Sequence, residues 1–120
     1  MLSREHRLTS SRQFSRAVRT GRRAGSRTLV VHHAAGQATA GTAQVGFVVS
    51  KAVGPAVTRN LVKRRLRHLT RTRLDGLPGS DVLVVRALPP AAAAAYGDLG
   101  ADLDRGLERL GLHRPGADAR

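Results

Sequence analysis

The 120-residue sequence predicts a single α+β domain, and three observations support this prediction. The length suits one hydrophobic core, since domains typically hold about 100 to 150 residues. Apolar residues recur at helical spacing in three stretches and form β-branched runs in three others. Their order is helix, strand, strand, helix, strand, helix, which is typical of the α+β class. We expect residues 1–112 to form the domain and residues 113–120 to form a flexible C-terminal tail.

The first three predicted elements occupy the N-terminal part of the chain. Residues 10–20 place apolar side chains at helical spacing among arginines, and Gly21 ends the pattern, so we expect a short basic amphipathic helix. Residues 28–34 and 44–50 are apolar and β-branched, and a segment rich in Gly and Ala connects them. We expect these two runs to pair as antiparallel strands.

Three further elements follow. Residues 55–74 return to the helical period, and Pro55 suits a first helical position because proline loses no hydrogen bond there. Residues 81–86 are almost continuously apolar, as expected for a central strand covered on both faces. We expect the last helix over residues 91–112, where interior glycines lower its propensity and tertiary packing must hold it. Its apolar stripe consists of Leu99, Leu103, Leu107 and Leu110.

The charge distribution predicts a polyanionic partner. The chain carries 21 Lys and Arg against 8 Asp and Glu, a formal net charge of +13 that solubility does not require. Of the basic residues, 16 precede residue 75, where Glu5 is the only acidic residue. All but Lys51 and Lys63 are arginines, whose planar guanidinium groups suit phosphate. The first 74 residues are therefore the expected binding region.

The sequence disfavours several classes of function. It has no cysteine, which excludes disulfides and thiolate metal sites, and it has no apolar run near the roughly 18 residues of a membrane span. His32 and His33 are adjacent, so in a strand they point to opposite faces and are unsuited to sharing a metal ion. No nucleophile elbow or phosphate-cradling glycine loop is present. We expect a cytoplasmic protein with no catalytic residue, no metal site, no membrane partner and no small-molecule substrate.

The helix predicted over residues 55–74 has one basic face. Its core side holds Val62, Leu66 and Leu69, and no acidic residue lies between Lys51 and Leu74. Like charges four residues apart repel one another, whereas phosphates would relieve the repulsion and make binding depend on salt. Gly46 and Gly54 could let a nucleic-acid backbone approach, although we expect local conformational reasons for both. The basic arc consists of Arg59, Asn60, Lys63, Arg64, Arg67 and Arg71.

The same region resembles a known signature. Residues 45–67 read VGFVVSKAVGPAVTRNLVKRRLR and closely resemble, without a gap, the signature segment of the bacterial ribonuclease P protein family. The opening LSREHRLTSSRQFSRAVRTG and the late DVLVVRALPP are also similar to that family, so the resemblance covers all but the tail. It implies an α/β sandwich resembling the second domain of ribosomal protein S5, with a central mixed sheet and a left-handed βαβ crossover at the signature helix.

The resemblance also implies a function. The family supplies the protein subunit of ribonuclease P, an endoribonuclease whose catalysis resides in its RNA subunit. The protein would bind that catalytic RNA and the 5' leader of precursor tRNA, and would assist Mg²⁺-dependent removal of the leader, with Mg²⁺ bound mainly by the RNA. Phe14, Val18 and His32 would line the leader-binding cleft. The RNA-binding residues would be Lys51, Gly54, Arg59, Asn60, Lys63, Arg64, Arg67 and, from the basic arc, Arg71.

The chain departs from the family pattern at two of the cleft positions and at Leu61 on the signature helix. Val18 and His32 stand where aromatics are frequent, and base stacking on a ring contributes roughly 1 to 3 kcal/mol. Leu61 stands where an arginine is common, so a phosphate contact is lost unless Arg65 or Arg71 replaces it. Leader contacts are therefore expected to depend more on arginine, His32 and apolar contact than on aromatic stacking.

Three alternative functions are weighed. A non-enzymatic ribosomal or general RNA-binding protein would explain the charge but not the ordered signature. A helix-turn-helix DNA-binding protein would need two adjacent short helices, whereas strands precede Pro55. A protein-only nuclease would need acidic metal ligands, which the basic region lacks.

Overall fold

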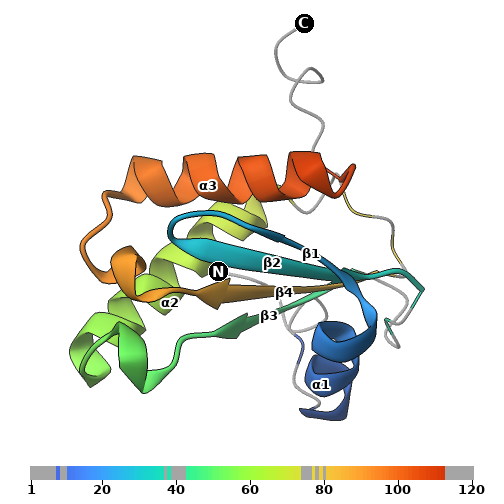
Figure 1. Cartoon of the computed structure of the whole chain (residues 1–120), viewed down its shortest axis with the longest axis horizontal. Coiled ribbons are helices and arrows are strands. Elements are labelled where there is room, and N and C mark those ends of the chain that lie inside the picture. Colours follow the sequence, from blue (N-terminus) through green and yellow to red (C-terminus); the bar gives the residue numbers. More distant parts are fainter. Residues whose placement is uncertain are drawn as a thin grey trace, which may run out of the picture.

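A computed structural model of the chain describes residues 8, 11–36, 38, 43–73, 77, 79 and 81–112, so the predicted tail lies outside the described residues. Helices and strands alternate in an order close to the expected one (Figure 1). The helices are α1 (Ser11–Thr20), α2 (Ala56–Arg71) and α3 (Tyr96–Arg109), with 3-10 turns η2 (Lys51–Val53) and η4 (Pro89–Ala92). The strands are β1 (Arg22–Gly25), β2 (Leu29–Ala34), β3 (Gln44–Val48) and β4 (Val82–Ala87).

The strands form one mixed sheet in the order β1-β2-β4-β3, which confirms the α+β class. β4 is antiparallel to β2 and parallel to β3, and α2 lies in the connection from β3 to β4. The expected antiparallel pairing of residues 28–34 with 44–50 is wrong, because β4 lies between them. β4 is the most continuously apolar strand, and the central position buries five of its six residues.

Two further expectations need correction. β1 was not predicted, because its sequence RRAG has no strand pattern of its own, and it forms by pairing with β2 at the sheet edge. The last helix begins at Tyr96 rather than at residue 91. Pro89 and Pro90 open a 3-10 turn there, and Ala95 is extended (φ −71°, ψ 155°) before the helix starts.

The helices cover the two faces of the sheet unequally. α3 lies across one face with α2, whereas α1 lies on the other (Figure 1). The larger core contains the predicted apolar residues of α2 and the whole leucine stripe of α3, all buried. None of the helices in the described part of the chain has the length and apolar character that a membrane span requires.

Close contacts hold α3 against the sheet despite its glycines. A Cβ at Gly106 would lie 2.8 Å from the Val31 side chain, so glycine permits the approach. Asp102 accepts hydrogen bonds from the Thr28 hydroxyl (2.6 Å) and the Thr28 backbone N–H (3.2 Å). Burial disfavours the ionised Asp102 carboxyl, but bonds from Thr28 and Arg105 outweigh burial and hold its pKa below the usual value.

Candidate nucleic-acid interface

The basic arc of α2 lies where the sequence places it, on the side away from the core. Asn60, Arg64 and Arg71 are exposed, whereas Arg59, Lys63 and Arg67 are half-buried. None of their cationic groups forms an ion pair within the described part of the chain, because the ion pairs found there use other residues. The arc is therefore a positive surface without internal neutralisation, as phosphate binding requires.

The turn before α2 positions the start of this surface. Gly54 has φ 156° and ψ −172°, which residues with side chains rarely adopt, and its N–H donates to the Lys51 carbonyl. Arg59 Nε donates to the Gly54 carbonyl oxygen (3.0 Å), so this guanidinium also holds the turn. Lys51 is exposed on η2. Gly54 thus has the local conformational reason that the sequence indicated.

Arg65 and Arg71 are the two candidates to replace the arginine that is missing at Leu61, and their surroundings differ. Arg65 donates to the Ala94 carbonyl oxygen (3.3 Å), so it is directed toward the connection before α3. Arg71 is exposed, and no hydrogen bond or ion pair is found for it among the described residues. Of the two, Arg71 is the one whose charge remains available to an external phosphate.

On the opposite face of the sheet, Phe14 packs against a glycine in β3. A Cβ at Gly46 would lie 2.3 Å from Phe14 Cζ, so Gly46 leaves the space that the ring occupies. One residue before Phe14 on α1, Gln13 Nε2 donates a hydrogen bond to Gln44 Oε1 on β3 (3.2 Å). The interpretation of Gly46 as a purely local conformational requirement is therefore wrong, because the glycine serves a long-range contact.

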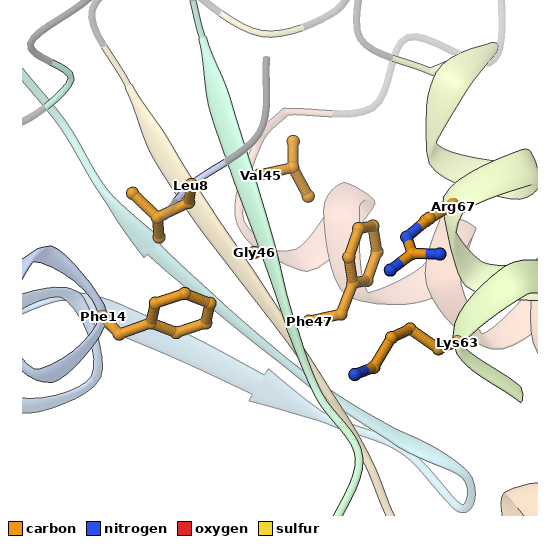
Figure 2. A pocket seen from close by; sticks show the side chains of 7 residues that line it. All are labelled: Leu8, Phe14, Val45, Gly46, Phe47, Lys63 and Arg67. Atoms are coloured by element: carbon orange, nitrogen blue, oxygen red, sulfur yellow. The ribbon is translucent and has the colours of Figure 1, made fainter. Parts of the chain in front are cut away.

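A pocket of about 210 Å³ connects the two regions along the outer edge of β3. Figure 2 shows Leu8 and Phe14 on one side of the strand, and Phe47, Lys63 and Arg67 on the other. Leu8 N–H donates to the Val45 carbonyl at this edge (2.9 Å). Two cations and two phenyl rings thus border one pocket, a combination suited to a nucleotide.

The other two cleft residues lie farther along α1 and β2. Val18 is half-buried and, like Phe14, packs against the small core under α1. His32 is only 3% exposed, and no partner is found for either ring nitrogen among the described residues. Burial, then Arg86 and then Arg23 lower the pKa of His32, so the imidazole is neutral at pH 7.

Sequence reasoning missed some residues of this surface. Phe47 and Leu8 line the pocket, and Arg23 and Arg86 act on His32. Phe47 belongs to the resembling segment but was treated as a strand residue. The positions of Arg23 and Arg86 depend on strand register, which local sequence patterns do not reveal.

Comparisons with known proteins agree with this geometry. A family model described as Ribonuclease P matches residues 2–111. A ribonuclease P protein component from Nocardioides sp. is 58% identical and aligns over 97% of this chain and all of the relative. That of Streptomyces bikiniensis is 52% identical over 92% of this chain and 95% of its own length.

Two solved structures share the fold. The RNase P protein of Staphylococcus aureus superposes with a TM-score of 0.80 at 23% identity, covering 91% of this chain and 98% of that chain. The RNase P protein of Thermotoga maritima gives 0.69 at 22% identity, covering 81% and 90%. The family model and the close relatives together cover nearly the whole sequence, and the chain belongs to the ribonuclease P protein family.

Proposed function

We propose that this chain is the protein subunit of a ribonuclease P and that it binds the catalytic RNA through α2 and the turn before it. The main support for this proposal is the basic arc of α2, whose charges have no acidic partner in the described residues, while the other side of α2 packs into the core. Family membership makes a general RNA-binding protein, which would bind RNA without supporting cleavage, the weaker alternative. The proposed RNA contacts are those of Lys51, Gly54, Arg59, Asn60, Lys63, Arg64, Arg67 and Arg71.

We also propose that the 5' leader of precursor tRNA crosses the sheet face beside α1. Phe14, held over Gly46, offers a ring for base contact, and Val18 continues the apolar wall. His32 lies buried beneath this surface, so we expect it to shape the surface rather than to contact the leader directly. The pocket bordered by Phe14 and by Lys63 joins the leader surface to the RNA-binding helix.

Hydrolysis of the phosphodiester is assigned to the RNA subunit, which is proposed to bind the Mg²⁺. No group of three His, Cys, Asp or Glu side chains that could hold a metal ion is found in the described residues. No reaction step is therefore assigned to a metal held by this chain. The protein contributes positioning and cationic neutralisation, which lowers the Mg²⁺ concentration that the RNA needs.

Reconstitution tests the proposal. The full chain is combined with a bacterial ribonuclease P RNA and precursor tRNA, and 5' leader release is followed at limiting Mg²⁺. Wild-type protein should raise the cleavage rate, and the double variant Lys63→Gln/Arg67→Gln should weaken assembly and reduce the salt slope by about one per lost phosphate contact. Arg59 is left unchanged because its guanidinium holds the Gly54 turn.

A charge-matched control separates α2 from general electrostatics. Arg105→Gln/Arg109→Gln removes two exposed cations from α3, on the far side of the sheet from α1. Because these guanidinium groups donate to Asp102 and to the Gly25 carbonyl oxygen, thermal melting first verifies that the variant is folded. This variant should assemble with nearly wild-type affinity. RNA binding without any gain in leader release would instead support the general RNA-binding alternative.

A further inference from the structure

Among the described residues, α1 covers one end of the sheet face that carries it and leaves the other end open (Figure 1). The strand register places Val30, Arg86 and Val48 side by side across β2, β4 and β3 at the other end. The two valines are half-buried and Arg86 is exposed. This row, together with Arg23 on β1, is called the open strip. It is apolar at its base and cationic at its surface.

Arg23 and Arg86 lie on either side of one buried imidazole. Arg23 pairs directly with His32 across β1 and β2, and Arg86 pairs with Val30, two residues before His32 on the same face. Burial, then the charges of Arg86 and Arg23, lower the pKa of His32, in agreement with this placement. No hydrogen bond or ion pair is found for either guanidinium in the described residues, and no described residue on this face is acidic.

His32 is a second, independent sign that this face receives a ligand. Its side chain is 97% buried, yet neither ring nitrogen has a partner among the described residues. Leaving such a group unpaired destabilises the fold, so a residue kept in this state calls for a function. An apolar residue of similar size would fill the position more stably. The polar group lies directly beneath the two unpaired cations.

We propose that Arg23 and Arg86 form a phosphate-binding subsite on the open strip, which holds the backbone of single-stranded RNA beyond Phe14 and Val18. The subsite extends the leader surface proposed above and rests on that function. Guanidinium groups bind phosphate in bidentate fashion, and Val30 and Val48 provide apolar contact for the sugar and base between phosphates. The two arginines thereby compensate for the aromatic side chains that this cleft lacks.

A chemical double-mutant cycle tests this assignment. The reconstituted holoenzyme binds precursor tRNAs that each carry one neutral methylphosphonate at a successive leader position. Wild-type protein should lose about three- to tenfold in affinity at one or two of these positions. The variant Arg23→Gln/Arg86→Gln should lose a similar factor with the unmodified leader, and at those positions the methylphosphonate should then cost nothing further.

The controls distinguish failure of the subsite from failure of leader binding. Arg109→Gln removes one cation from α3, on the opposite face, together with its hydrogen bond to the Gly25 carbonyl oxygen on β1, and should retain the full methylphosphonate effect. If the affinity losses from the methylphosphonate and from Arg23→Gln/Arg86→Gln added up at every leader position, the subsite would be overturned. The same holds if the double variant bound precursor tRNA like wild type. In both cases the proposal of leader binding would stand. Equal affinity of the wild-type holoenzyme for precursor and mature tRNA would overturn both. Thermal melting of each variant verifies that the exposed substitutions leave the fold intact.

Discussion

At the scale of single residues, the contact between Phe14 and Gly46 has the clearest consequence. Replacing Gly46 by Ala would place a methyl group inside the volume of the ring and force Phe14 to move. Overpacking of this kind costs about 1 to 3 kcal/mol, so Gly46→Ala should lower the free energy of unfolding by that amount in urea titration. It should also reduce the preference of the holoenzyme for precursor over mature tRNA.

The matched control for this prediction is Gly25→Ala. Gly25 is also a strand glycine, but an added Cβ would meet only Val30 Cγ2 at an ordinary 4.0 Å. This variant should unfold at nearly the wild-type urea concentration and keep the precursor preference. If both alanine variants lost the same free energy of unfolding, the loss would reflect strand propensity rather than the space beneath Phe14.

His32 should make stability depend on pH. Burial and the charges of Arg86 and Arg23 lower its folded-state pKa below the ordinary 6.5, so the unfolded chain binds a proton more readily. Stability is therefore greatest above pH 6.5 and declines as the pH falls through this value. His32→Leu removes the titrating group and the unpaired nitrogens, so it should stabilise the protein by about 1 kcal/mol at pH 7 and more at pH 5.5.

Urea titrations of both proteins at pH 7.5 and 5.5 measure this effect. A stability difference between wild type and His32→Leu that stays constant over this range would show that the imidazole is not the group whose protonation destabilises the fold. The prediction also separates stability from function. A gain in stability on losing His32 would show that the residue does not serve the stability of the fold.

At the scale of elements, the docking of α3 depends on one buried carboxylate. Asp102→Ala would leave the Thr28 hydroxyl and N–H without their acceptor, and should lower stability by about 2 to 3 kcal/mol at pH 7. Because hydrogen bonds lower its pKa, the stabilisation by Asp102 should disappear as the pH falls through 3.8 and below. Chemical denaturation from pH 7 to pH 3 measures both effects.

Asp104 on the same helix provides a control, because it also pairs with a residue outside α3. Asp104 pairs with Arg73 on the segment after α2, but its side chain is 33% exposed and water screens the pair. Asp104→Ala should therefore cost less than about 1 kcal/mol. Equal losses for the two substitutions would mean that helix propensity, rather than the buried bonds, determines the change.

The elements that could be predicted from sequence are those with a strong local pattern. The core stripe of α2 and the leucine stripe of α3 are visible from helical periodicity alone, and both are buried. β1 could not be predicted, because RRAG becomes a strand only through pairing with β2. The order of the strands was also out of reach, since the placement of β4 between β2 and β3 is a long-range choice.

In the candidate site, too, some features could be predicted from local sequence and others depend on long-range pairing. The arc of α2 follows from one helical projection, because all of its members belong to a single element. The subsite of Arg23 and Arg86 combines β1 with β4, residues 63 positions apart in sequence, and becomes visible only through strand register. Surfaces built across strands therefore need the structure, whereas surfaces on one helix do not.

At the scale of the whole molecule, three acidic residues form internal bonds, whereas the cations of α2 and the open strip are left for partners. Asp81 accepts a hydrogen bond from the Gly36 N–H and pairs with His33, while Asp102 and Asp104 pair with Arg105 and Arg73. The cations of α2 and the open strip have no such partners in the described residues. The chain thus presents positive charge on the RNA-binding helix and on the face that carries α1.

This distribution predicts how precursor binding responds to salt and to an added ring. Val18→Phe should tighten precursor binding by about 1 kcal/mol, or roughly fivefold, because a base can stack on phenyl. Stacking releases no counterions, so the slope of log affinity against log salt should stay unchanged. Titrations at several salt concentrations measure both quantities, and Val18→Leu provides an apolar control without a ring. A steeper slope for the phenylalanine variant, or an equal gain with leucine, would show that the leader is held there by charge or by apolar contact rather than by stacking.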